Sequence, residues 1–261
     1  MNFNIFHKRK KNRSKMEVEN LEIDLSTLDG ILKFERNNQL TFDDRINFLY
    51  PKAKRNSKKV PRNLSSQDKS DFVKLSNKHP FQCEYKPGSG YRYSDVGSIR
   101  TSHPIPEDCE IYYYEVLIVS QGERGRIAVG LTALGTDLTH QPGWDRHTFG
   151  YHGDDGGYFR ENGYPGHQQY GPTFGTNDVI GCGINFKTRT CFFTKNGKCL
   201  GTVFKNMPVM NLYPTIGVHS KGEIVSINFG QKPFLYNIKM EMVLNEAMSR
   251  DAETSSKAIS A

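Results

Sequence analysis

Short runs of β-branched and aromatic residues between positions 64 and 235 constrain the fold more than any other feature. They recur about every 8–12 residues, the spacing typical of an all-β sandwich or barrel. The residues between them are rich in Gly, Pro, Asn and Asp, which turns require. Because no helical pattern intervenes, crossover helices cannot join parallel strands. We therefore predict an all-β antiparallel sandwich over residues 64–235.

The runs also predict the individual strands. The strongest covers 111–119, and the others are expected at 72–75, 81–85, 126–131, 179–186, 190–194, 200–204, 212–218 and 223–229. Asn196-Gly197 lies between two of these runs. That pair predicts a type I′ hairpin, because both central residues of such a turn need positive φ. We read the Gly- and Asp-rich stretch 144–157 as a turn joining two strands.

The basic charge of the chain is confined to its N-terminal part. The net charge is +7, and residues 1–62 contain 15 Lys and Arg against 8 Asp and Glu, whereas residues 63–261 contain 20 of each. We expect 1–62 to be a mostly disordered basic leader, with clusters at 8–15 and 52–59 that could act as a nuclear-localisation signal or bind nucleic acid. Nucleic-acid binding is not expected of the sandwich, which has no excess charge for phosphate.

The two ends of the chain carry no membrane or secretory signal. No apolar run approaches the roughly 18 residues that a membrane-spanning helix needs. The first residues turn basic before any long apolar stretch, unlike a signal peptide. We therefore expect a cytoplasmic or nuclear protein without membrane contact. Residues 236–261 are predicted to form a short helix followed by a disordered tail.

The five cysteines fit that compartment, because their number is odd and no pair has the CxxC spacing of a zinc site. Cys182 and Cys191 lie in apolar runs and are expected to be small buried hydrophobic residues. We expect no disulfide framework and no cofactor.

Catalytic chemistry has one candidate. His147, His152, Asp154 and Asp155 are close in sequence and could bind a metal or transfer protons. Their spacing identifies no further ligand, so a turn with locally hydrogen-bonded histidines is the favoured interpretation. A metal-dependent enzyme stays an alternative. Trp144, the single tryptophan, is either a core anchor or an aromatic on a binding rim.

Several motifs together resemble a SPRY domain, of the kind found in RanBPM-like Ran-binding scaffold proteins. They are Ser102-His103-Pro104-Ile105-Pro106, Ile111-Tyr112-Tyr113-Tyr114-Glu115-Val116, Pro142-Gly143-Trp144-Asp145, Gly150-Tyr151-His152-Gly153-Asp154-Asp155-Gly156, Tyr170-Gly171-Pro172-Thr173-Phe174, Asp178-Val179-Ile180-Gly181-Cys182, Phe193-Thr194-Lys195-Asn196-Gly197 and Asn211-Leu212-Tyr213-Pro214-Thr215. The resemblance spans about residues 48–238.

The resemblance implies a bent two-sheet sandwich without enzymatic activity. It also implies that short peptide segments of partner proteins dock on loops at one end and, by analogy, that ubiquitin ligase subunits are partners. By position, the expected binding residues are Lys86, Tyr91, Arg92, Gly125, Arg126, Trp144, Val218, His219 and Ser220. Aromatic, Arg and His side chains at these loops are types that supply contact area and directional hydrogen bonds.

Overall fold

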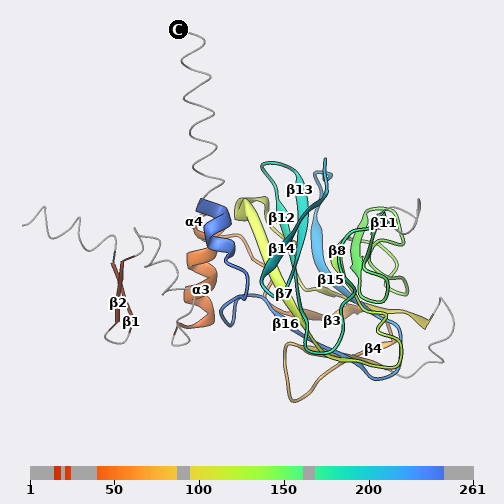
Figure 1. Ribbon diagram of the computed structural model, residues 1–261. Helices are drawn as coiled ribbons and strands as arrows, with labels where there is room; N and C mark the ends of the chain where they lie inside the picture. The colour runs from red at the N-terminus through yellow and green to blue at the C-terminus, as the bar shows by residue number, and fades with distance from the viewer. Residues whose placement is uncertain (1–14, 19–20, 25–39, 87–94, 161–167, 244–261) are drawn as a thin grey trace, which may run out of the picture.

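The computed structural model describes residues 15–18, 21–24, 40–86, 95–160 and 168–243. Two seven-stranded antiparallel sheets form a sandwich (Figure 1). The first has the order β11 (Gln168–Gln169), β10 (Gly157–Arg160), β9 (Thr148–His152), β8 (Ala128–Ala133), β15 (Leu212–Val218), β6 (Gly97–Thr101), β3 (Leu64–Lys69). The second has the order β14 (Lys198–Phe204), β13 (Thr190–Lys195), β12 (Val179–Asn185), β7 (Ile111–Gln121), β16 (Glu223–Asn228), β5 (Gln82–Tyr85), β4 (Val73–Leu75). The predicted all-β antiparallel sandwich is confirmed.

Strand β7 lies at the centre of the second sheet and buries three consecutive tyrosines. Successive side chains of a strand point to opposite faces of the sheet, so Tyr112 and Tyr114 lie on one face and Tyr113 lies on the other. Tyr114 reaches the opposite sheet, where its hydroxyl donates to the Gly130 carbonyl at 2.6 Å. Tyr113 points to the outer face and is nevertheless fully buried, because Phe234 and Tyr236 pack on its ring at centroid distances of 5.0 and 5.5 Å. The segment after the last strand is therefore part of the core.

Glu115 holds that C-terminal segment in place. Its carboxylate is 3% exposed and accepts the backbone N–H groups of Leu235 and Tyr236 at 2.9 and 3.0 Å. The Tyr113 hydroxyl donates to the same carboxylate at 3.0 Å. Residues 238–243, the described part of the predicted C-terminal helix, follow at once as a helix.

The predicted boundary of the basic leader differs from the structure. Helix α3 (Phe42–Leu49) begins at a Thr41 capping box with Asp44, and helix α4 (Pro51–Arg55) follows. Ile46, Leu49, Tyr50, Ala53 and Val60 join the hydrophobic core. Both helices lie beside the C-terminal helix at one side of the sandwich (Figure 1).

Residues 40–60 therefore belong to the folded domain rather than to a disordered leader. Their few apolar positions are interspersed with Lys and Arg, which concealed the helices in the sequence. The second basic cluster, 52–59, thus lies on and after a helix whose Ala53 is buried. The first cluster lies outside the described residues, apart from Lys15 at the start of β1 (Lys15–Val18), which pairs with β2 (Leu21–Asp24).

The hairpin prediction at Asn196-Gly197 is confirmed. The two residues have φ values of 50° and 77°, and Lys195 pairs with Lys198 across the turn. Within 144–157 the prediction of a continuous turn is wrong, because Thr148–His152 forms β9 and pairs with both β8 and β10. The glycines that suggested a turn instead admit close backbone contacts.

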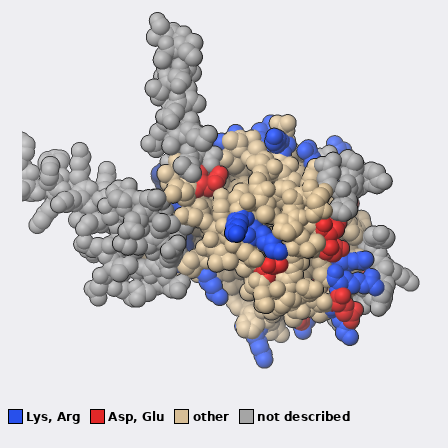
Figure 2. Space-filling view, viewed as in Figure 1, with Lys and Arg blue, Asp and Glu red and all other residues tan. Residues whose placement is uncertain are grey.

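The mixture of surface charges and the burial of Cys182 and Cys191 agree with the expectations from the sequence. On the face shown in Figure 2, Lys and Arg are interspersed with Asp and Glu, and most of the surface is neither. Cys182 and Cys191 are at most 1% exposed, as predicted, and all five cysteines are free thiols. None of the helices in the described ranges is long and apolar enough to cross a membrane.

Candidate functional site

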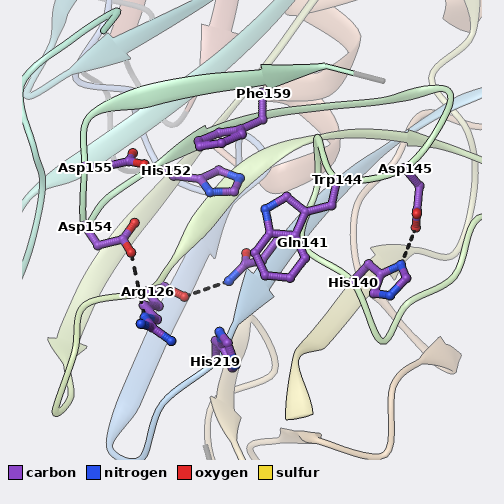
Figure 3. Close-up of a pocket in the computed structure, with 10 residues that line it drawn as sticks. All are labelled: Arg126, His140, Gln141, Trp144, Asp145, His152, Asp154, Asp155, Phe159 and His219. Atoms are coloured by element: carbon purple, nitrogen blue, oxygen red, sulfur yellow. Dashed lines mark hydrogen bonds and ion pairs between the residues drawn. The ribbon is translucent and has the colours of Figure 1, made fainter. Parts of the chain in front are cut away.

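Loops at the end of the sandwich opposite the helices enclose a pocket of about 550 Å³ (Figure 3). That volume is within the range of small-ligand pockets. Its walls come from the segment before β8, the β8–β9 loop, β9 and the turn after it, β10, and the loop after β15. The lining residues are Arg126, His140, Gln141, Trp144, Asp145, His152, Asp154, Asp155, Phe159 and His219.

A tight turn fixes Trp144 in the wall of this pocket. The Trp144 N–H donates to the Gln141 carbonyl at 3.0 Å. The Thr148 hydroxyl accepts from the backbone N–H groups of Gly143 and Asp145 and donates to the Asp145 carbonyl. Because both sides of the turn are tied to the start of β9, the half-buried indole has a defined position.

Gly150 lets this turn approach β9. A Cβ atom at Gly150 would lie 2.0 Å from the Pro142 carbonyl oxygen, which no side chain could tolerate. The same carbonyl lies 2.8 Å from Nε2 of His152, two residues further along the strand. The glycine therefore allows the Trp144 turn to pack directly against the backbone of β9.

Three imidazole rings surround the Trp144 indole. The rings of His140, His152 and His219 lie 6.2–6.3 Å from it, centroid to centroid. His152 is 5% exposed and stacks on Phe159 at 4.1 Å. Its burial lowers the pKa of His152 below the ordinary histidine value, so the ring is neutral at neutral pH.

Glu223, the first residue of β16, ties two loops of the site together. Its fully buried carboxylate accepts the N–H groups of Arg126, His219 and Ser220 at 2.7, 2.5 and 3.0 Å, and the Ser220 hydroxyl at 2.5 Å. Burial raises the pKa of Glu223, and the four donated hydrogen bonds act in the opposite direction. The carboxylate thus satisfies backbone N–H groups of these loops, as a neighbouring strand would within a sheet.

Carboxylates outnumber guanidinium groups among the described residues of the pocket wall. Asp145, Asp154 and Asp155 line it together with one guanidinium, that of Arg126. Arg126 Nε lies 3.9 Å from Asp154 Oδ2, a loose ion pair (Figure 3). Asp145 Oδ2 lies 2.8 Å from Nδ1 of His140. Among the described residues, the three carboxylates and the one guanidinium therefore give the pocket wall a net negative charge.

The structure brings three of the predicted binding residues together. Arg126, Trp144 and His219 line this one pocket, although they lie far apart in the sequence. Gly125, with φ of 63°, precedes Arg126 and lines a neighbouring polar hollow that shares Asp154 with the pocket.

The other predicted residues have different positions. Val218 and Ser220 are 1% and 2% exposed and do not line the pocket, whereas His219 lines it although it is itself 2% exposed. Lys86 is exposed at the end of β5, away from the pocket lining. Tyr91 and Arg92 lie outside the described residues.

The proposed metal cluster does not assemble. The Trp144 pocket is lined by His152, Asp154 and Asp155. His147 does not line it, and its φ of 62° lies outside the range of a β-strand. No group of three or more His, Cys, Asp or Glu side chains within the described ranges could hold a metal ion. Sequence reasoning did not identify Glu223, because an acid opening a strand has no distinguishing pattern.

Comparisons with known proteins agree with this architecture. A family model, the SPRY domain, matches residues 111–232. Ran-binding protein 10 of Danio rerio is 47% identical over 197 residues, which is 76% of this chain and 32% of that protein. Human Ran-binding protein 9 is also 47% identical, over 75% of this chain and 26% of that protein.

Solved structures support the same conclusion. A crystal structure of a human SPRY domain is 35% identical with a TM-score of 0.54, and the match covers 61% of this chain and 96% of that one. The chain spans about a third of the length of the Ran-binding protein 10 it matches. Two antiparallel sheets in this order, together with the matched motifs, show that the chain belongs to the SPRY-domain family of protein-interaction modules.

Proposed function

We propose that this chain is a non-catalytic adaptor that captures short linear segments of partner proteins in the Trp144 pocket. The observation that carries the proposal is the convergence of Arg126, Trp144 and His219 on one concave surface. A partly buried tryptophan in a pocket with polar walls is an arrangement that can anchor peptides at interaction sites.

The construction of the pocket supports binding rather than chemistry. Glu223, Thr148 and Gly150 hold the loops rigidly through backbone contacts, so little ordering accompanies binding. The buried imidazole of His152 is held by Pro142 and Phe159 rather than by a nucleophile or an acid–base partner. A preformed surface of this kind favours recognition of an extended segment.

Capture of peptides from a random display library tests the proposal. The whole chain should enrich a motif, and Trp144→Ala and His219→Ala should each lose it while their thermal unfolding stays cooperative. Val209→Ala is the matched control, because Val209 is 73% exposed and does not line the pocket. An enriched motif that both pocket variants retain would contradict the assignment of the site.

The wider role remains part of the same proposal. By analogy with RanBPM-like proteins, the captured segment would be presented to ubiquitin ligase subunits in the cytoplasm or nucleus. Co-purification of ligase subunits with the chain, in equal amounts from wild type and Trp144→Ala, would separate assembly from capture. The absence of such subunits would leave peptide capture as the whole function.

The basic excess of residues 1–62 supports a second candidate, association with nucleic acid. Retention on RNA that weakens with salt and disappears when residues 1–39 are removed would favour it. Because the helices at 40–60 belong to the folded domain, the deletion stops before them.

A further inference from the structure

The charge of the Trp144 pocket specifies one feature of the segment it binds. Three carboxylates and one guanidinium line it, so an occupant of opposite charge gains more than a neutral or acidic one. Trp144 lies on the same wall between His152 and His140 (Figure 3), and an indole is the ring that best attracts a cation. Acidic groups and an indole face therefore converge on the same volume.

The hydrogen-bonding groups of the wall have the same bias. The carboxylates of Asp145, Asp154 and Asp155 accept but do not donate when ionised. Gln141, which is 3% exposed, uses its amide N–H on the Arg126 carbonyl at 2.9 Å. A ligand group rich in donors meets these acceptors better than a carboxylate does.

Among the described residues, Arg126 supplies the one guanidinium on the wall, and its pairing is weak. The 3.9 Å separation from Asp154 exceeds hydrogen-bond distance, and both side chains are 37% exposed. A second guanidinium could therefore approach Asp154 without first breaking a strong pair. It would also approach Asp155, whose Oδ1 accepts the Gly157 N–H at 2.8 Å.

We propose that the pocket recognises a segment carrying an arginine or lysine, whose cationic group packs on Trp144 and pairs with Asp154 and Asp155. The inference rests on the proposed function, since it names the class of segment that this pocket binds. Arginine fits better than lysine, because its planar guanidinium can stack on an indole and pair with carboxylates at once.

Two substitutions with opposite expected effects on peptide affinity give the sharpest test. For a selected peptide, Asp154→Asn should weaken binding about tenfold, and Arg126→Gln should strengthen it, because the first removes attraction and the second removes repulsion. Replacing the peptide's arginine with the uncharged isostere citrulline should weaken binding to wild type about tenfold and to Asp154→Asn much less. The fluorescence of Trp144, the single tryptophan of the chain, reports binding at the pocket directly.

Glu107→Gln is the matched control, because it removes the same charge from an exposed residue outside the pocket lining and should leave affinity unchanged. A motif that depends on Trp144 but contains acidic or only apolar residues would overturn the inference and leave the proposed function standing. The same conclusion would follow if Asp154→Asn strengthened peptide binding and Arg126→Gln weakened it. A library that yields no Trp144-dependent motif would overturn both.

Discussion

The two ends of the sandwich have been completed in different ways. Beyond the start of β7, helices α3 and α4 and the C-terminal helix close the end and bury Leu49, Tyr50 and Ile238. Beyond the far end of β7, loops together with residues of β9 and β10 line the Trp144 pocket, and no helix covers it among the described residues. Helices that bury apolar side chains stabilise the fold at the first end. The other end keeps a concave, loop-lined surface. Under the proposed function, stability therefore depends on one end and recognition on the other.

Two buried glutamates show the same division in detail. Glu115 accepts two backbone N–H groups of the segment that covers Tyr113, and Glu223 accepts three from the loops that frame the pocket. Burial raises the pKa of both carboxyl groups. Each one organises irregular backbone that has no strand partner, but a different property of the protein depends on each.

The largest expected effect comes from removing the closed end. A chain that begins at residue 64 loses Ile46, Leu49 and Tyr50 from the core, at roughly 1.5–3 kcal/mol for each large side chain. That loss is comparable with the whole stability of a domain, about 5–15 kcal/mol, so the shortened chain should be unfolded by circular dichroism. A chain that begins at residue 40 is the control and should unfold at the same temperature as the full chain.

Removing the Glu223 carboxylate, which holds the loops at the open end, should lower both stability and peptide binding. Glu223→Ala leaves the N–H groups of Arg126, His219 and Ser220 without their acceptor, which should lower the free energy of unfolding by about 3–5 kcal/mol. Urea denaturation measures the first effect, and loss of peptide-induced change in Trp144 fluorescence measures the second. Full binding by a destabilised Glu223→Ala would mean that the loops keep their shape without the carboxylate.

The corresponding change at Glu115 should separate the two properties. Glu115→Ala should lower the free energy of unfolding by about 2–3 kcal/mol, because fewer backbone donors lose their acceptor. Peptide affinity should stay within about twofold of wild type, since Glu115 contacts no residue of the pocket among those described. If affinity falls as far as in Glu223→Ala, the two ends are coupled rather than independent.

The smallest effect is a dependence of stability on pH at His152. The folded pKa is lowered by burial, so below the ordinary histidine pKa of about 6.5 the unfolded chain binds a proton that the folded chain does not. Stability should therefore fall as the pH drops below that value. Between pH 6.5 and 5.5, wild type should lose more stability than His152→Gln, by at most about 1 kcal/mol, as measured by urea denaturation at each pH. Parallel losses in the two proteins would remove His152 as the cause.

Much of the strand pattern was predictable from local sequence. The runs at 111–119, 179–186 and 212–218 combine β-branched and aromatic residues between turn residues, and each one is a strand. Strands β3, β6, β9, β10 and β11 were not predicted. Strand β3 reads Leu-Ser-Ser-Gln-Asp-Lys and lacks the signature, so its strand conformation comes from pairing with β6 rather than from propensity. Strand β9 contains Thr148, Phe149 and Tyr151, but Gly and Asp residues around it favoured a turn.

The proximity of three candidate residues could be predicted from the sequence, but their role as a binding site stays a prediction. Arg126, Trp144 and His219 were identified from resemblance and residue type, and the pocket unites them. Asp154, Asp155 and His152 were noticed as possible metal ligands, yet they line the Trp144 pocket together with those residues. Only spatial proximity distinguishes the two interpretations, because sequence spacing does not report which side chains share a wall.

The sequence by itself determined the sandwich, the hairpin at Asn196-Gly197 and the burial of Cys182 and Cys191, since alternation, positive φ and hydrophobicity are local properties. Tertiary structure alone decided that helices at 40–60 close one end and that Glu223 joins two loops at the other. Those features depend on contacts between residues distant in the chain, so no local pattern encodes them. The Trp144 pocket and its acidic wall exist only because the fold brings them together.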